Sequence, residues 1–159
     1  MPRITKSEAL EKLHLLLRLI IKPEQKAVPV EIKKQMTTTW KPISLSELHD
    51  EIYKTEIELN GELWNFWELI KIDPAKWTEK KYGHDGGGFW VVAICGTKII
   101  WYNDIEDGFN ISDYRTYGQI ERYYCNQDEL NSAVTRLFDL VKFGGEIIGQ
   151  AGPPQNLVK

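Results

Sequence analysis

The chain has 159 residues, of which 42% are hydrophobic and 27% are charged, and its formal net charge at pH 7 is −3. This length fits one domain, and these proportions are ordinary for a globular protein, which excludes a wholly disordered chain and a coiled coil. The acidic balance gives no general attraction to nucleic acid, and no apolar run is long enough to span a bilayer, so we predict neither nucleic acid nor membrane as a partner.

The cysteines and the N-terminus favour a cytoplasmic protein. Cys95 and Cys125 are too few for a disulfide framework and show neither zinc nor redox spacing. The N-terminal apolar run is interrupted by Arg18 and Lys22 and has no small-residue cleavage site, which argues against a signal peptide. We therefore predict a cytoplasmic location and two free thiols.

The N-terminal part is expected to hold one helix and a connector. Thr5 and Glu8 have capping-box spacing, and apolar residues recur at helical intervals until Pro23, which predicts a helix over residues 5–22. Its broad apolar stripe indicates core packing or, alternatively, a partner on its second side. Residues 23–43 contain three prolines and are predicted to form a connector with a short edge strand at 28–32.

A second helix is expected over residues 46–59. Ser44 and Glu47 repeat the capping-box spacing, and apolar residues then stay on one helical face as far as Leu59. Asn60-Gly61 is a typical C-terminal stop. The competing interpretation makes Asn60-Gly61 the turn of a hairpin between residues 57–59 and 63–64.

The next segment, residues 63–72, is apolar on both possible faces. Trp64, Phe66, Ile70 and Ile72 alternate, and Pro74 ends the run. We therefore predict a strand over 66–72, with a short buried helix as the alternative.

A β-hairpin is predicted after a glycine-rich loop. Four glycines among residues 83–88 require positive φ angles or close backbone approach, so this loop has a special geometry. Residues 89–95 and 98–103 are rich in β-branched and aromatic side chains, and Gly96-Thr97 is a two-residue turn of type II′ character. The turn sets the expected pairs as Cys95 with Lys98, Ile94 with Ile99, Ala93 with Ile100, Val92 with Trp101 and Val91 with Tyr102.

Both faces of this hairpin are apolar, so we expect it at the centre of the sheet. One face is then covered by helices, and the other by a loop, by an N-terminal segment or by a second subunit. After the hairpin, residues 119–124 are predicted as a strand and 127–142 as a helix, with Asn126 as its N-cap, Glu129 completing the capping box and Gly144-Gly145 closing it.

The overall expectation is an α+β domain over residues 1–145. An antiparallel sheet of about four strands, with the hairpin at its centre, is packed against N-terminal and C-terminal helices. Residues 146–159 are rich in glycine and proline and are predicted to be a flexible tail.

The main candidate site is a cluster of side-chain oxygens that follows the hairpin. It consists of Asn103, Asp104, Glu106, Asp107 and Asn110. Its spacing does not match the calcium loop of an EF-hand. We therefore expect no metal; instead, Asp104 and Asn110 are expected to bond to nearby backbone N–H groups and to fix a turn at Gly108.

An enzyme is the alternative. A metal-dependent or acid/base hydrolase would use Asp104, Glu106 and Asp107 with His84 nearby, because carboxylates and imidazole transfer protons and bind cations. The sequence has no nucleophile elbow, and its glycines match neither nucleotide-binding loop. We therefore predict no catalytic residues and no cofactor.

The predicted function is protein binding through an acidic and aromatic surface around residues 103–124. Aromatic residues are frequent between 64 and 124, and most of them are expected in the core. Tyr114 and Tyr117 are expected at the surface, beside the oxygen cluster, and are included in the predicted binding site. A small acidic protein of this kind would suit an inhibitor or an immunity-like role against a basic protein, or self-association as a homo-oligomer.

Overall fold

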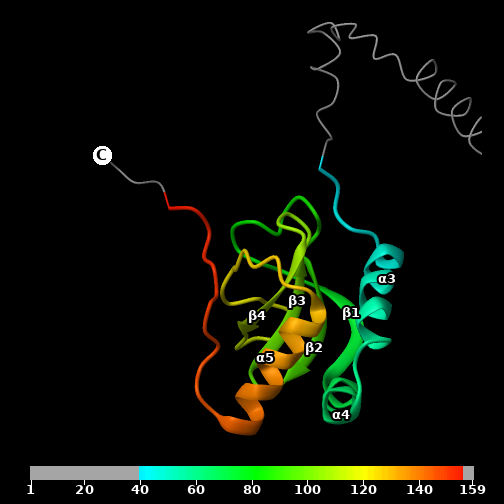
Figure 1. Cartoon of the computed structure of the whole chain (residues 1–159). Coiled ribbons are helices and arrows are strands. Elements are labelled where there is room, and N and C mark those ends of the chain that lie inside the picture. Colours follow the sequence, from blue (N-terminus) through cyan, green and yellow to red (C-terminus); the bar gives the residue numbers. More distant parts are fainter. Residues whose placement is uncertain (1–39, 156–159) are drawn as a thin grey trace, which may run out of the picture. The chain divides into compact units, whose positions relative to one another are not determined.

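The computed structural model describes residues 40–155, so the predicted helix at 5–22 and the predicted edge strand at 28–32 lie outside the described residues. The described elements follow the order α3 (Leu45–Glu56), α4 (Gly61–Ile70), β1 (Lys71–Trp77), β2 (Phe89–Cys95), β3 (Lys98–Asn103), β4 (Gly108–Asp113) and α5 (Leu130–Phe143). The strands form one antiparallel sheet in the order β1-β2-β3-β4 (Figure 1). The predicted α+β class, the number of about four strands and the central hairpin are confirmed, but two of the strands come from other residues than predicted.

The helix α3 begins at the predicted capping box. Ser44 Oγ accepts a hydrogen bond from the backbone N–H of Glu47 (3.2 Å), and Glu47 Oε2 accepts one from the backbone N–H of Ser44 (2.9 Å). The helix ends at Glu56, three residues earlier than predicted. Asn60 is the N-cap of the next helix, so neither the helix stop nor the hairpin turn proposed for Asn60-Gly61 is correct.

The predicted strand at 66–72 is wrong, because residues 61–70 form the helix α4. Phe66, Trp67 and Ile70 lie on one helical face and are buried in the core. A segment that is apolar all round fits either period, and packing against the sheet selects the helix. The chain becomes extended only at Lys71, where β1 begins.

The predicted hairpin register is correct near the turn and wrong beyond it. Cys95 pairs with Lys98 and Ala93 with Ile100, as expected, but the register then shifts and Val91 pairs with Trp101. Val92 is the additional residue of a β-bulge, which places Val92 and Ala93 on the same face of the sheet. A bulge of this kind cannot be read from residue alternation.

The sheet has a hydrophobic cluster on each face. On one face Val92, Ala93 and Ile100 pack against all three described helices, and Figure 1 shows α5 lying across this face. On the other face Trp101 packs with residues that include Ile120 and lie after β4. A loop therefore covers the second face, which is one of the three alternatives predicted for the apolar hairpin.

The fourth strand is not the predicted one. Residues 119–124 make only an isolated bridge, between Gln119 and Thr78, and are otherwise not extended into a strand. The strand β4 instead comes from residues predicted as a polar loop. Asn110 and Ser112 are buried in β4, and the Ser112 hydroxyl accepts a hydrogen bond from Trp101 Nε1 (2.8 Å) and donates one to the carbonyl of Arg122 (2.7 Å).

The C-terminal helix is confirmed, with a later start than predicted. Glu129 is the N-cap of α5, and Gly144 closes the helix with a φ of 76°. The residues after the helix return along the sheet, where the backbone N–H of Ala151 donates to Asn126 Oδ1 (2.8 Å) and the backbone N–H of Cys125 donates to the carbonyl of Ala151 (2.7 Å). In the described part of the chain, none of the helices is both long enough and apolar enough to cross a membrane.

Candidate functional site

The connection between β3 and β4 is a four-residue turn organised by Asn103. Asn103 Oδ1 accepts hydrogen bonds from the backbone N–H groups of Ile105 (3.0 Å) and Glu106 (3.3 Å), which is a common way for asparagine to stabilise a turn. Asp107 has a φ of 59°, a region that aspartate enters more readily than most residues. The turn therefore precedes Gly108, which begins β4. The prediction that Asp104 and Asn110 fix the turn is wrong, because their side chains accept hydrogen bonds from the backbone N–H groups of Ile43 and Asn126 instead.

Two of the predicted binding residues, Asn103 and Asn110, are buried and join the turn to the segment before α5. Asn103 Nδ2 donates to the carbonyl of Tyr124 (2.9 Å). Asn110 Nδ2 donates to the carbonyl of Asn126 (3.1 Å), and Asn110 Oδ1 accepts from the Asn126 N–H (2.8 Å). Their exposed fractions are 0% and 2%, so both amides support the fold and neither reaches the surface.

Asp104 anchors the residues that lead into α3. Asp104 Oδ2 accepts a hydrogen bond from the backbone N–H of Ile43 (3.1 Å), and its carbonyl accepts one from Trp40 Nε1 (2.7 Å). Burial raises the pKa of Asp104, while the Ile43 N–H and the charge of Lys76 oppose that shift. Asp104 therefore connects segments that are far apart in the sequence.

Carboxylates from three parts of the chain line a groove beside α3, which we call the acidic groove. It has a volume of about 380 Å³ and lies between α3, the β3–β4 turn and the N-terminal end of α5. Its acidic lining residues are Glu51, Glu58, Asp107, Asp128 and Glu129. The basic side chain among the lining residues is Lys54.

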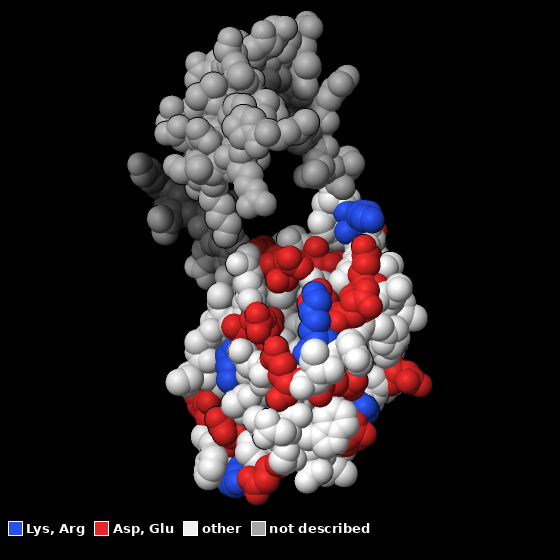
Figure 2. Space-filling model, turned by 45° about the vertical axis from the view of Figure 1, so that its right-hand side comes forward, with Lys and Arg blue, Asp and Glu red and all other residues white. Residues whose placement is uncertain are grey.

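A second hollow of about 310 Å³ adjoins the acidic groove. Glu51, Tyr102 and Asp107 line both, and the second hollow adds Glu47 and Asp104. It also adds one basic residue, Lys41, whose Nζ lies 4.0 Å from Glu47 Oε1. Figure 2 shows acidic side chains gathered on the face of the molecule that carries α3. The two hollows therefore form one continuous acidic surface.

The electrostatic field in the acidic groove favours positive charge. Lys54 Nζ lies 2.5 Å from Glu51 Oε1, and Glu51, with smaller contributions from Asp50 and Asp107, raises the pKa of Lys54. Residues 40–155 contain 19 Asp and Glu against 11 Lys and Arg, a formal net charge of −8. The described part is therefore more acidic than the whole chain.

Tyr102 lies at the base of both hollows. Burial raises the pKa of Tyr102, and the hydrogen bond from its hydroxyl to Asp107 Oδ1 acts in the same direction. The phenol therefore stays protonated and holds the Asp107 carboxylate at the rim.

The remaining predicted site residues lie on the other face of the sheet. Tyr114 and Tyr117 pack against Trp77 of the second hydrophobic cluster, with ring centroids 5.1 Å and 4.9 Å from that of Trp77. Burial raises the pKa values of Tyr123 and Cys125 in this cluster, and the charge of Glu106 acts in the same direction. The predicted surface over residues 103–124 is thus divided between two places.

His84 is separate from the carboxylates of the turn. Its Nε2 lies 3.0 Å from the carbonyl oxygen of Lys80, and it lines a hollow of about 280 Å³ that shares no residue with the acidic groove. Within residues 40–155, no three His, Cys, Asp or Glu side chains are grouped so as to hold a metal ion. Asp104, Glu106 and Asp107 therefore do not form a ligand set.

The glycine-rich loop presents carbonyl oxygens to a lysine. Lys76 Nζ donates hydrogen bonds to the carbonyls of Gly86 (3.1 Å) and Gly88 (2.8 Å) and lies 4.8 Å from the ring centroid of Trp90. Burial lowers the pKa of Lys76, whereas Asp104 acts to raise it. The ammonium group of Lys76 therefore holds the glycine-rich loop in place.

Sequence reasoning missed four carboxylates of the acidic groove: Glu51, Glu58, Asp128 and Glu129. A partial signal was available for Glu51, because Glu47 and Glu51 are four residues apart on α3 and so share a face. The approach of α5 to α3 is a tertiary contact, which residue spacing does not reveal.

Comparison with protein-family models, with curated proteins and with solved structures found no match to this chain.

Proposed function

We propose that this protein is a non-catalytic protein-binding module that binds a basic partner protein through the acidic groove and the adjoining hollow. The supporting observation is the convergence of carboxylates from α3, the β3–β4 turn and the start of α5 in one groove, where they outnumber the single lining lysine. Lysine and arginine side chains of a partner find the same favourable field that acts on Lys54. An inhibitor or immunity-like protein that blocks a basic protein has this chemistry.

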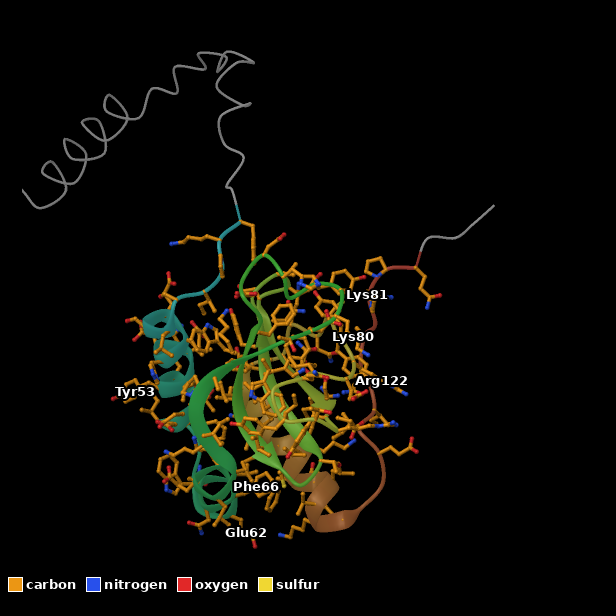
Figure 3. All side chains as sticks on the ribbon, turned by 180° about the vertical axis from the view of Figure 1, so that it is seen from behind. Tyr53, Glu62, Phe66, Lys80, Lys81 and Arg122 are labelled. Carbon is orange, nitrogen blue, oxygen red and sulfur yellow. The ribbon has the colours of Figure 1, made fainter. Side chains whose placement is uncertain are left out.

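The distribution of basic side chains supports this choice of surface. Figure 3 shows Lys80, Lys81 and Arg122 on the side of the molecule away from α3. In the described part of the chain, the two lysines that line the acidic groove and the adjoining hollow are each close to a glutamate, Lys54 to Glu51 and Lys41 to Glu47. Arg136 is likewise paired with Asp128, so the repulsion of a basic partner by these cations is reduced.

The hydrolase alternative gains no support from the geometry, because His84 and the carboxylates of the turn line separate hollows. We further propose a cytoplasmic location, where the free thiols of Cys95 and Cys125 stay reduced. The two thiols pack against different hydrophobic clusters.

The proposal is tested by titrating the ¹⁵N-labelled protein with hexalysine and following the backbone amide signals by NMR. We expect the shifts to concentrate in residues that line the acidic groove, and the affinity to fall at least about tenfold between low and high salt, since salt screens exposed charges. Hexaglutamate serves as the control and is expected not to bind. Equal shifts at distant carboxylates such as Asp85 and Asp139 would indicate unspecific attraction and contradict the proposal.

A further inference from the structure

The flank of α3 that faces away from the acidic groove lines a second large groove, which we call the apolar groove. Its volume is about 500 Å³. One wall is formed by His49, Ile52, Tyr53 and Glu56 of α3, whose spacing of three and four residues places them on one helical face. The other wall is formed by Trp67, Glu68 and residues 71–74, where α4 passes into β1.

The two grooves use opposite sides of α3. Glu47, Glu51, Lys54 and Thr55 face the acidic groove and its adjoining hollow. At about 100° per residue, this set points roughly 170° away from the set that lines the apolar groove. A ligand in one groove therefore leaves the other free.

The floor of the apolar groove is rigid and hydrophobic. Ile52 and Trp67 belong to the main core and are only 8% and 1% exposed. Trp67 Nε1 donates to Glu56 Oε1 (2.8 Å), which satisfies the indole N–H and fixes the ring. Tyr53, at 65% exposure, projects outward from α3 at the rim (Figure 3).

The rim of the apolar groove carries mainly negative charge. Glu56, Glu68 and Asp73 line it together with one lysine, Lys71. Lys71 Nζ lies 2.5 Å from Glu68 Oε1 and 3.1 Å from Glu56 Oε1, so its charge is already paired. The hydrogen bond to Glu68 is the largest cause that raises the pKa of Lys71.

These features select the chemistry of the occupant. An apolar floor of this size accepts one or two large side chains, and groove volumes of 300–1,000 Å³ are typical of binding sites. An acidic rim favours lysine or arginine next to those side chains and disfavours an anionic peptide. Addition of a strand to β1 is disfavoured, because Pro74 in the wall has no N–H to donate.

We propose that the apolar groove binds a short partner segment in which an aromatic or large aliphatic side chain is flanked by basic residues. The apolar side chain enters the groove above Ile52 and Trp67, and Tyr53 closes over it. The flanking cations meet Glu56, Glu68 and Asp73. This proposal concerns a different surface from the acidic groove and stands or falls separately from the proposed function.

The test uses three capped tripeptides and the ¹⁵N-labelled full-length protein. Ac-Lys-Phe-Lys-NH₂ is expected to shift the Trp67 indole N–H signal and the amide signals of residues 49–56 and 67–74. Ac-Lys-Ala-Lys-NH₂ lacks the apolar anchor and Ac-Glu-Phe-Glu-NH₂ reverses the charge, so each is expected to bind at least tenfold more weakly. Equal affinities for the three peptides, or shifts concentrated elsewhere, would overturn the proposal.

A pair of variants separates binding from folding. Tyr53→Ala removes the rim aromatic and is expected to weaken Ac-Lys-Phe-Lys-NH₂ at least fivefold. Leu69→Ala removes a side chain that is 84% exposed and lies outside the groove, so its affinity is expected to equal that of the unaltered protein. Both residues are exposed, and both variants are expected to keep the thermal midpoint. An unchanged affinity of Tyr53→Ala would refute the role of the rim.

Discussion

The amides and the carboxylates around the β3–β4 turn come from one short stretch of sequence but have different structural roles. Asn103 and Asn110 are buried and bond to the backbone of residues 124–126. Asp104 and Asp107 lie at the rim of the acidic surface. An amide both donates and accepts, so it can pair with both backbone groups of a buried segment, whereas a carboxylate only accepts and stays near water or a donor.

The difference teaches that a polar cluster after a strand need not be one site. Side-chain chemistry separates its members into the buried amides, which support the fold, and the carboxylates that line the acidic surface. Substitutions of the first kind should change the free energy of unfolding, and substitutions of the second kind should change binding.

The largest effect on stability is expected at Gly108, which lies between Asp107 and Asn110 in the sequence. A Cβ at this position would lie 2.4 Å from Gln127 Cα and 2.7 Å from the Asn126 carbonyl oxygen, both in backbone. Gly108→Ala is therefore expected to lower the free energy of unfolding by about 3 kcal/mol, measured by urea denaturation. Gly152→Ala is the matched control, since nothing lies within 4 Å of its added Cβ. Similar stabilities for the two variants would contradict the close approach of β4 to residues 126–127.

Removal of a buried amide should have the next largest effect. Asn110→Ala leaves the Asn126 N–H and carbonyl without their partner, so we expect a loss of about 2 kcal/mol in the free energy of unfolding. Asn65→Ala, at an exposed position of α4, is the control and is expected to change stability by less than about 0.5 kcal/mol. If the two substitutions have the same effect, the structural role of Asn110 is wrong.

Asp104 shares features of both sets, because it is partly buried and also lines the acidic surface. The pH dependence of stability tests the effect of its burial. Because burial raises its pKa in the folded state, the charged form lowers stability, and this loss disappears as the pH falls through the folded pKa. Asn at position 104 keeps an acceptor for the Ile43 N–H but carries no charge. Asp104→Asn is therefore expected to be more stable than the unaltered protein at pH 7, by less than about 1 kcal/mol, and this advantage should shrink towards pH 4.

Urea denaturation of both proteins at the two pH values measures that advantage. A variant that is less stable at pH 7, with a deficit that disappears in acid, would show that attraction to the charge of Lys76 outweighs the burial of Asp104.

The smallest effect on stability is expected for the exposed carboxylates of the acidic groove. The double variant Glu58→Lys/Glu129→Lys should lose less than about 1 kcal/mol, part of it from the less favourable charge at the N-terminus of α5. Thermal or urea unfolding measures this change. A loss comparable to that of Asn110→Ala would place these carboxylates with the structural set.

The features that could be predicted from sequence are those set by neighbouring residues. The capping box of Ser44 and Glu47 and the hairpin turn at Gly96-Thr97 depend on side chains within three residues of each other, and both are confirmed. Both apolar faces of the hairpin also followed from composition. The predicted register failed from Val92 onwards, because the bulge there shifts the pairing of Val91 to Trp101.

The features that could not be predicted depend on distant contacts. Residues 63–72 fit both periods, and the contact of Phe66 and Trp67 with the core selects α4. The strand β4 was missed because its buried Asn110 and Ser112 make it look like a loop, and their partners lie 16 and 10 residues further along the chain, respectively. The acidic groove was found only in part, because Asp104 and Asp107 meet Glu51 and Glu129 through tertiary packing.

The central claim, that the acidic groove binds a basic partner, is tested most directly by calorimetric titration of hexalysine into two matched variants. Glu58→Lys/Glu129→Lys and Asp139→Lys/Glu146→Lys change the net charge equally, and all four positions are exposed, but only the first pair lines the acidic groove. We predict at least about tenfold weaker binding for the first variant and a smaller loss, below about threefold, for the second. Equal losses in the two variants would show that hexalysine responds to net charge alone and would contradict the claim.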